Sequence, residues 1–425
     1  MVRGDRFVNA GQWENLYQSL KKPQAGPVVT GFNANIDRVI PVTPDLLRSL
    51  EQHTVPGYDV ILPRLKHSMR YCSADEMFVS DPSVFHKLAD FFSASGTLAI
   101  GGQAGIAAIQ MRRLGIGSVT CAVPAAGPHT RDILRSAGVI PLTFASGAGD
   151  HPDRVHLIFE YSPGLVPVAD GVVPRSNRFI VSPVHDPSTV LIPAEYEDSF
   201  LEQIATCRRA FLSGYQYLQT KVEFITASRQ IRLIRGVNPR MRTHVECVSG
   251  AGRPVLDKMI RYILPNSDSV GFNEQELGML MHALGAAPDP VPADPSSTLP
   301  VEYVRECIVF ANATGVPRVH LHTFGYYILV LKPGLVQPEL SRNALLFAAR
   351  FTADAAGGDT QVLSREGLLA YSYVREAFGP DEAPGIFHSN DRVVVFIPTC
   401  ISQQIRKTTG LGDILSSTAF VADPF

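Results

Sequence analysis

The chain has 425 residues, of which 45% are hydrophobic and 18% are charged, which is the usual composition of a folded globular protein. One small core cannot organise a chain of this length, so we expect one large domain that carries a smaller one, or two domains. The formal net charge of −2 provides no overall basic field, which argues against nucleic acid as a partner.

The cysteines and the apolar runs indicate a cytoplasmic protein. The six cysteines include no C-x-x-C pair and no zinc-binding spacing, so we expect reduced core residues. No apolar segment typical of a signal peptide follows Met1, and no stretch approaches the roughly 20 apolar residues of a membrane span. We therefore expect a cytoplasmic chain with no membrane partner.

Short apolar runs alternate with helical spacing along the chain. The runs predict buried strands at residues 27–31, 118–123, 210–213, 244–248, 269–272, 318–322 and 393–397. Apolar residues at three- and four-residue steps predict helices at residues 105–114, 255–263 and 274–284. This alternation is typical of an α/β fold with a mostly parallel central sheet.

Two regions depart from this pattern. A Gly-rich loop at 143–152 is followed by alternating polar and apolar side chains at 154–161, which predict a half-exposed sheet. Together with residues 37–95, this region could form a small domain with a solvated face. Residues 286–300 are rich in Pro, Asp and Ser and predict a surface loop inserted in the large domain.

The first polar motif follows the first strand and contains Asn33, Asn35 and Asp37 in a predicted turn. Its amides and carboxylate offer the mixed donors and acceptors that sugar hydroxyls need. Further along, Gly101 and Gly102 precede a helix and would let a ligand approach the backbone. Two ordinary turns are the alternative, and either motif alone would favour that alternative.

The predicted strand at 244–248 begins with His244-Val245-Glu246, whose first and third side chains share one face. A carboxylate in an apolar strand is costly unless it is paired or linked to a metal. Glu246 is therefore a candidate metal-shell residue. A salt-bridged edge strand is the alternative.

The string Asn273-Glu274-Gln275-Glu276 follows the strand at 269–272, and ligands bind at such strand ends in open α/β sheets. Glu276 would lie near a phosphate-bound cation, and magnesium prefers carboxylates, often through water. Alternatively, Asn273 could be a helix N-cap and Glu276 its capping-box partner. When the string is considered without the other motifs, this structural alternative is favoured.

The string Gly410-Leu411-Gly412-Asp413 is the sharpest feature. A Gly-rich turn that opens a helix directs free N–H groups and the positive end of the helix dipole at one spot, which favours an anion. A carboxylate beside that spot could take a proton from an attacking hydroxyl, as phosphoryl transfer requires. A turn with Asp413 as an N-cap is the alternative.

Taken together and in order, these motifs resemble the ADP-dependent phosphofructokinases and glucokinases of the ribokinase superfamily. The resemblance extends from Gly31 to Ala419. Its most specific strings are residues 31–37, 101–106, 176–182, 213–216, 244–246, 273–276, 320–323 and 410–413.

The resemblance implies a ribokinase-like α/β/α sandwich with a smaller, discontinuous β-sheet lid. The large nucleotide-binding domain would comprise residues 1–36, 96–153 and 185–425, and the sugar-binding lid residues 37–95 and 154–184. It also implies transfer of the β-phosphoryl group of ADP to a sugar with Mg²⁺, and release of AMP. We expect a monomer or a small homo-oligomer.

The resemblance also implies the site residues. Asp413 would be the catalytic base, with the amides of Gly410 and Gly412 as the anion hole, and Glu246 and Glu276 would hold the magnesium and its waters. Candidate sugar-binding residues are Asn35, Asp37, Gly102 and Gln103. Candidate nucleotide-binding residues are His322, Thr323, Tyr326, Thr399 and Asn273.

The residues that select the sugar give mixed signals. Glu76 and His156 are similar to positions of the glucokinase branch, and a carboxylate at 76 would repel a sugar phosphate. Arg154 and Arg178 are instead similar to phosphate-binding cations of the phosphofructokinases. Val184 stands where the phosphofructokinases carry a second Arg, and its absence removes a bidentate phosphate contact. Glucose, fructose 6-phosphate and both sugars remain open.

Two further readings also remain open. One is an ATP-dependent ribokinase-like kinase of another sugar or of a nucleoside. The other is a catalytically silent relative that binds sugar or nucleotide.

Overall fold

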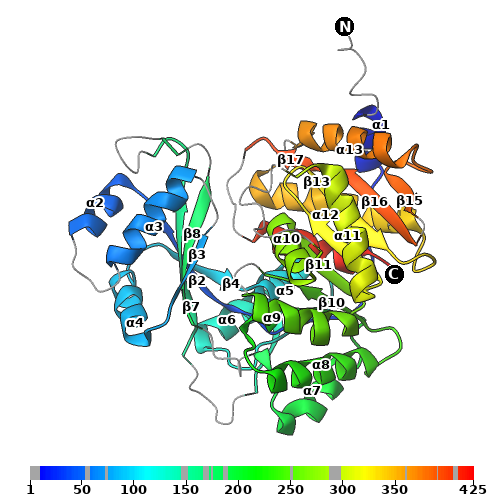
Figure 1. The fold of residues 1–425 in the computed structure, drawn as a ribbon. Helices are drawn as coiled ribbons and strands as arrows, with labels where there is room; N and C mark the ends of the chain where they lie inside the picture. Colours follow the sequence, from blue (N-terminus) through cyan, green and yellow to red (C-terminus); the bar gives the residue numbers. More distant parts are fainter. Residues whose placement is uncertain are drawn as a thin grey trace.

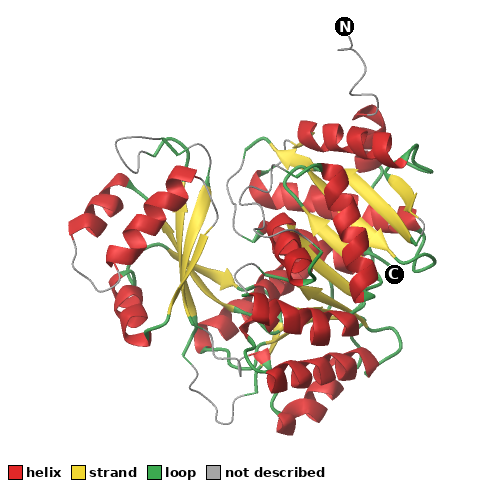
Figure 2. Cartoon of the chain, in the orientation of Figure 1, coloured by secondary structure: helices red, strands yellow, loops and turns green. Residues whose placement is uncertain are grey.

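The computed structural model describes residues 10–52, 58–71, 75–144, 152–165, 172–173, 176–184, 190–248, 252–286, 298–358, 361–389, 391–404 and 410–425. In this part of the chain a ten-stranded sheet and a five-stranded sheet lie apart, each with its own helices (Figures 1 and 2). A separate pair is formed by β14 (Gln361–Leu363) and β17 (Cys400–Ser402).

The large sheet has the order β15-β16-β13-β12-β11-β10-β9-β1-β5-β6. Strands from β12 to β6 are parallel, whereas β13, β16 and β15 add an antiparallel edge. Their bounds are β1 Val28–Gly31, β5 Val119–Ala122, β6 Ile140–Leu142, β9 Arg209–Leu212, β10 Arg242–Glu246, β11 Ser269–Asn273, β12 Arg318–His322, β13 Tyr326–Leu331, β15 Ile386–Ser389 and β16 Arg392–Pro398. Each predicted strand is present, and the mostly parallel sheet is confirmed.

Helices cover both faces of this sheet. On one face Phe272 of β11 packs edge-on against Phe310 of α11, and on the other face Glu246 of β10 contacts Ser416 of α14. The helices of the large part are α1 Ala10–Gln18, α5 Gln103–Arg113, α6 Pro128–Ser136, α7 Glu197–Ile204, α8 Lys221–Gly236, α9 Arg253–Lys258, α10 Glu274–Ala283, α11 Pro300–Thr314, α12 Pro338–Gly357, α13 Arg365–Phe378 and α14 Leu411–Ala422. The predicted helix at 255–263 is α9 continued by a π-helix, Met259–Ile263.

The small sheet has the order β3-β8-β7-β2-β4. Its strands are β2 Asn35–Pro41, β3 Asp75–Val79, β4 Thr97–Gly101, β7 Val155–Tyr161 and β8 Asn177–Pro183, and its helices are α2 Pro44–Gln52, α3 Tyr58–Tyr71 and α4 Pro82–Phe91. Leu157, Phe159, Phe179 and Val181 form a core with these helices. Because strand side chains alternate, the remaining positions face the large sheet (Figure 1).

Two sequence predictions about this region were wrong. Asn35 and Asp37 were expected in a turn, but they begin β2. Strand β7 was expected to be half-exposed, yet His156, Leu157 and Ile158 are all buried, because the strand lies inside the sheet and both of its faces are covered.

Some predictions concern segments that the structure does not fully describe. Most residues of the predicted loops at 143–152 and 286–300 lie outside the described residues. The division into domains stays a prediction, and β4 and the first residues of β2 join the small sheet from beyond the boundaries that the sequence suggested.

The five described cysteines are free and buried, as predicted, and Cys72 lies outside the described residues. None of the helices in the described part combines the length and apolar character needed to cross a lipid bilayer.

Candidate active site

The motifs found in the sequence meet at one edge of the large sheet, where the parallel strands end. Asn33 follows β1, Ser213 follows β9, Glu246 ends β10, Asn273 ends β11 and His322 ends β12. The carboxyl ends of parallel strands share one edge, which is where open α/β sheets bind ligands. The first turn of α14 reaches the same edge, as the contacts of Gly412 show below.

Gly410 is the N-cap of α14 and adopts a left-handed backbone with φ of 73°. Asp413 therefore lies in the first helical turn, and the alternative in which it caps the helix is wrong. A Cβ atom at position 410 would lie 3.8 Å from Asp413 Oδ2, so the carboxylate stays close to the turn. The first backbone N–H groups of a helix have no intrahelical partner, so α14 offers donors to an anion beside this carboxylate.

His322 packs directly against the same turn. A Cβ atom at position 412 would lie only 3.1 Å from His322 Nε2, so a side chain there would displace the imidazole. Burial lowers the pKa of His322 to about 4, with the nearby His244 adding to the effect. The ring is therefore neutral at neutral pH and adds no charge beside the turn.

The first polar motif is built from β2 and the start of α5. Asn35 Nδ2 donates to Asp37 Oδ1 at 2.7 Å. A Cβ atom at Gly101 would overlap both of these side chains, and one at Gly102 would lie 2.8 Å from Asn35 Oδ1. The two glycines therefore leave room for the polar side chains of β2, and their part in letting a ligand approach the backbone stays a prediction.

Asp37 connects the small sheet with the Gly-rich turn electrostatically. Burial raises the pKa of Asp37 to about 7, although its hydrogen bond with Asn35 opposes the shift. The negative charges of Asp413 and Glu76 raise this pKa further, and Arg178 lowers it. Asp37 of the small sheet and Asp413 of α14 therefore lie close enough for their charges to interact.

The predicted sugar-binding residues of the small sheet share the face that looks toward the large sheet. Asp37 lies opposite His156 across β2 and β7, and Glu76 lies beside Ser182, whose hydroxyl donates to Glu76 Oε1 at 2.7 Å. Burial raises the pKa of Glu76, and Ser182 and then Arg178 oppose this.

The charges of two arginines, Arg154 and Arg178, act on this face. Burial, with the charge of Arg154, lowers the pKa of His156 to about 3, so the imidazole stays neutral. Arg178 donates from its backbone N–H to Asn177 Oδ1 at 2.9 Å, and its charge acts on both Asp37 and Glu76. The face thus combines neutral donors, carboxylates and arginines.

Tyr217 belongs to this group and was missed by the sequence analysis. It lies in the 3-10 turn Tyr215–Tyr217 on the side of the large sheet, and Asn33 Nδ2 donates to its hydroxyl at 3.5 Å. Burial raises the pKa of Tyr217, and the charge of Glu76 adds to this while Arg154 opposes it. The motif recognised at 213–216 ended one residue short of Tyr217.

Glu246 lies in a central strand, between β9 and β11, so the alternative of an edge strand is wrong. Its Oε2 accepts a hydrogen bond from Ser416 Oγ at 2.5 Å and lies 2.8 Å from His244 Nε2. Burial raises the pKa of Glu246 to about 8, and Ser416 and then Arg318 oppose the shift. Ser416 was also missed, although it is a polar residue one turn after Asp413 in an apolar helix.

Asn273 and Glu276 form the capping box that the sequence offered as an alternative. Asn273 Oδ1 accepts from the backbone N–H of Glu276 at 2.9 Å, and Glu276 Oε2 accepts from that of Asn273 at 2.8 Å. Among the described residues there is no group of three side chains that could hold a metal by themselves.

The charges of Glu276 and Glu246 nevertheless both act on Cys247. Burial raises the pKa of Cys247 well above its ordinary value, and the charges of Glu276 and Glu246 raise it further. The carbonyl of Cys247 accepts a hydrogen bond from Gln103 Nε2 at 3.1 Å. The start of α5 and the two carboxylates are thus brought together.

The predicted nucleotide-binding residues lie around the turn between β12 and β13. Thr323 Oγ1 donates to the carbonyl of Tyr326 at 2.6 Å, and Thr399 Oγ1 donates to that of Gly325 at 3.1 Å. Tyr326 is only 4% exposed and its ring stacks on Phe396, so its side chain packs in the core, and its part in nucleotide binding stays a prediction.

Residues 26–422 match the family model of the ADP-specific phosphofructokinase/glucokinase conserved region. An ADP-dependent glucose/glucosamine kinase of Pyrococcus furiosus is 27% identical, over 97% of this chain and 98% of the relative. An ADP-specific phosphofructokinase of Pyrococcus horikoshii is 26% identical, over 94% of this chain and 98% of the relative.

A solved structure of an ADP-dependent kinase in complex with fructose 6-phosphate and ADPβS has a TM-score of 0.80 at 24% sequence identity, over 99% of this chain and 97% of the other. The shared fold confirms the ribokinase-like α/β/α arrangement that the sequence implied. Because the family model spans nearly the whole chain, the chain belongs to the ADP-specific phosphofructokinase and glucokinase family.

Proposed function

We propose that this chain is an ADP-dependent hexose kinase that transfers the β-phosphoryl group of ADP to fructose 6-phosphate, to glucose or to both, and releases AMP. The observation that carries the proposal is the placement of Asp413 in the first turn of α14, beside Gly410 and near enough for its charge to raise the pKa of Asp37 in the small sheet. A sugar held by the small sheet would there meet a carboxylate and a helix N-terminus suited to phosphate.

Asp413 is the proposed general base. Its carboxylate takes the proton from the attacking sugar hydroxyl, whose oxygen then bonds to the β-phosphorus as the bond to the AMP oxygen breaks. The N–H groups that follow Gly410 donate to the transferring phosphoryl oxygens, and the dipole of α14 stabilises their charge. His322, neutral and packed on Gly412, keeps this turn in place.

Glu246 and Glu276 are the proposed magnesium-shell residues. Both carboxylates are buried and both charges act on Cys247, which suits Mg²⁺, since this ion usually keeps several waters and takes one or two carboxylates together with substrate phosphates. When bound, the ion would neutralise charge on the nucleotide phosphates. Ser416 and His244 orient Glu246, and the capping box orients Glu276.

The small sheet is the proposed sugar-binding lid. Asn35, Asp37 and Gln103 supply polar groups for hydroxyls, and Glu76 accepts a hydroxyl bond where a phosphate would be repelled. Arg154 and Arg178 supply the cations that a sugar phosphate requires. The named activities of the two relatives described above, one on glucose or glucosamine and one a phosphofructokinase, fit a face that holds both kinds of group.

The nucleotide is proposed to lie over the β12–β13 turn, near His322, Thr323, Thr399 and the Asn273 cap. The free, buried cysteines of the described chain suit a reducing cytoplasm as its compartment.

A comparison of phosphoryl donors tests the proposal. Initial rates with ADP and with ATP are measured at saturating glucose and at saturating fructose 6-phosphate, with Mg²⁺ present. We expect turnover with ADP and little with ATP. Faster turnover with ATP would replace the proposal with an ATP-dependent sugar kinase, and binding of ADP without turnover on either sugar would indicate a catalytically silent relative.

A further inference from the structure

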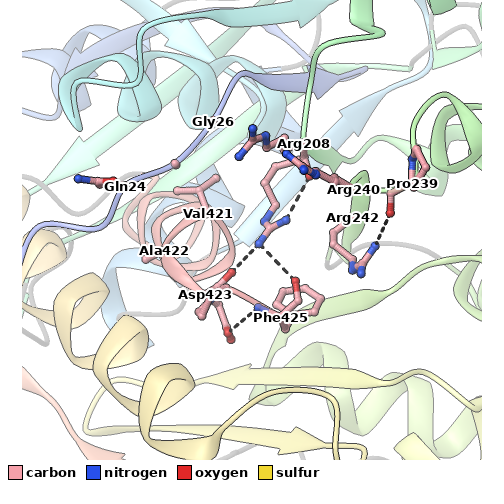
Figure 3. Close-up of a pocket in the computed structure, with 13 residues that line it drawn as sticks. Gln24, Gly26, Arg208, Pro239, Arg240, Arg242, Val421, Ala422, Asp423 and Phe425 are labelled. Carbon is pink, nitrogen blue, oxygen red and sulfur yellow. Dashed lines mark hydrogen bonds between the residues drawn. The ribbon is translucent and has the colours of Figure 1, made fainter.

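A cavity of about 340 Å³ lies at the opposite end of the large sheet, where the strands begin. It is bounded by the segment before β1, the turns before β9 and β10, and the end of α14. Figure 3 shows Arg208, Arg240 and Arg242 on one side of the cavity and the end of α14, with Asp423 and Phe425, on the other; the Arg242 guanidinium turns toward Pro239. None of the proposed catalytic residues lines this cavity.

The cavity gathers positive charge. Its described lining residues include four arginines, Arg208, Arg209, Arg240 and Arg242, against one carboxylate, Asp423. Arg209 and Arg242 are direct neighbours on adjacent parallel strands, a placement in which like charges repel. Burial and, among its causes, the charge of Arg242 lower the pKa of Arg209 to about 10.

The single carboxylate is already neutralised. Asp423 Oδ2 accepts from Arg318 Nε at 2.9 Å, and both side chains are fully buried. Arg209 is also committed, because its Nη2 donates to the carbonyl of Asp423 at 2.7 Å, next to the C-terminal end of α14. Even with a carboxylate group on Phe425, cations would outnumber anions among the lining groups.

The other three arginines have little internal bonding. Among the described residues, the guanidinium of Arg242 donates only to backbone carbonyls, that of Met241 at 3.1 Å and that of Pro239 at 3.4 Å. Within the described part of the chain, the guanidinium groups of Arg208 and Arg240 have no hydrogen-bond acceptor. Their donors are therefore available to a ligand.

The backbone that carries these arginines is held firmly. Asn238 Nδ2 donates to the carbonyl of Cys207 at 2.5 Å, and Asn238 Oδ1 accepts from the backbone N–H of Arg240 at 2.9 Å. The backbone N–H of Arg208 donates to the carbonyl of Pro27 at 2.8 Å. One asparagine thus joins the two arginine-bearing turns, so their relative positions do not depend on a ligand.

We propose that this cavity is a second ligand site, which binds a small anion carrying two or more phosphate charges. Guanidinium forks match phosphate oxygens in bidentate pairs, and several forks at one cavity favour a multiply charged group. The volume lies at the small end of ligand pockets, which suits a pyrophosphate or a small phosphorylated metabolite. The proposal does not depend on the proposed kinase activity, because the cavity lies at the other end of the sheet.

Calorimetric titration with inorganic pyrophosphate tests the site. The double variant Arg208→Gln/Arg242→Gln keeps the side-chain stems but removes two guanidinium groups. We expect saturable binding to the wild type that weakens at least about tenfold in the double variant and not in Arg305→Gln, a matched change of an exposed arginine on α11. Pyrophosphate that also occupies the catalytic turn would contribute equally in all three proteins.

ADP-dependent turnover serves as the check of folding, since neither variant touches the proposed catalytic residues. If the double variant does not fold, Arg240→Gln replaces it, because that side chain is exposed and bonds to none of the residues that the structure describes. Equal pyrophosphate affinity in the wild type and the variant, or no saturable binding to the wild type, would overturn the proposal. Equally tight binding of citrate would overturn the assignment to phosphate.

Discussion

The two ends of the large sheet gather side chains of opposite charge around the same helix, α14. At the carboxyl ends of the strands, Asp413 lies in the first turn of this helix and Glu246 lies against Ser416. At the amino ends, Arg209 donates to the carbonyl of Asp423, just past its last residue. The first N–H groups of α14 are left for an anion, whereas its last carbonyls attract a cation.

The charged residues at the two ends differ in whether the fold itself requires them. Arg209 donates to the carbonyl of Asp423 at the end of α14, and Arg318 donates to the carboxylate of Asp423. Both arginines therefore have structural roles. The carboxylates at the other end are different, because burial raises the pKa of Asp37 and of Glu246 well above ordinary values. Carboxylates that are costly to ionise are typical of functional sites.

A buried chain of contacts joins the two ends. Arg318 Nη1 donates to Ser269 Oγ at 2.9 Å, Ser269 Oγ lies 2.8 Å from His244 Nδ1, and His244 Nε2 lies 2.8 Å from Glu246 Oε2. His244 is held between the rings of Phe211 and Phe420. The proposed metal residue is therefore positioned by the same polar cluster that anchors the end of α14.

Replacement of Asp413 by Asn should have the largest effect at the carboxyl end. Loss of a general base typically costs 10²- to 10⁴-fold, so we expect kcat to fall by roughly that factor while ADP binding stays within about twofold. Steady-state kinetics and calorimetry measure the two quantities. Asp198→Asn, which changes an exposed first-turn carboxylate of α7, is the control. Near-normal turnover of Asp413→Asn would remove the base from the mechanism.

Replacement of Asp37 by Asn should change how stability depends on pH. The folded-state pKa of about 7 lies above the unfolded value, so the folded state holds the proton longer and the wild type should lose stability as pH rises from about 4 to 7. The loss is on the order of 1 kcal/mol for each pKa unit, and it should vanish in the variant. Urea unfolding across this range measures it.

Asp153 provides a control, because its pKa is shifted in the direction opposite to that of Asp37. Burial raises its pKa, but hydrogen bonds from Thr130 and His129 lower it more, so its net pKa is below the ordinary value. The stability that ionised Asp153 contributes is fully present above its unfolded-state pKa and is lost as pH falls. Asp153→Asn should therefore flatten the acid side of the stability profile and leave the decline toward pH 7 unchanged. Identical profiles for Asp37→Asn and the wild type would contradict the assignment.

Replacement of Glu246 by Gln should weaken magnesium dependence. Residues that orient a metal and its waters typically contribute 10- to 100-fold in metal affinity, so we expect the Mg²⁺ concentration at half-maximal rate to rise by about that factor. Glu306→Gln changes another partly buried carboxylate, on α11, and should leave the Mg²⁺ curve unchanged. An equal shift in both variants would indicate a general structural effect.

The pair Glu76→Ala and Val184→Arg should have the smallest effect, on the choice of sugar. Removing the carboxylate and adding a guanidinium each favour a phosphate, so kcat/KM for fructose 6-phosphate over glucose should rise by about tenfold. Val222→Arg adds the same cation at an exposed position of α8 and should leave the ratio unchanged. A ratio that moves toward glucose would show that the small sheet does not select the sugar in this way.

Much of the fold could be predicted because its signals are local. Continuous apolar runs marked the strands of the large sheet, and β12 was predicted to the residue. Two other features depend on partners far away in the sequence. Strand β7 alternates like a half-exposed strand, but His156 and Ile158 on its second face are buried as well, and Gly101 makes room for side chains of β2.

The candidate site likewise contains residues that local sequence signals predicted and residues that they did not. The α14 turn and the capping box of Asn273 could be read from short strings. Tyr217 and Ser416 could not, because each acts through a partner more than 100 positions away, Asn33 and Glu246 respectively. The arginine cavity could not be predicted from the sequence either, since it combines residues from four separate segments of the chain.

The most direct test of the central claim is the amount of AMP and of sugar phosphate formed in one reaction. Wild-type protein is incubated with ADP and Mg²⁺, with glucose, with fructose 6-phosphate and without sugar, and both products are quantified by chromatography. The account predicts equal amounts of AMP and of newly phosphorylated sugar with at least one of the two sugars, and no AMP without sugar. AMP that forms without sugar, or no phosphorylated product with either sugar, would contradict it.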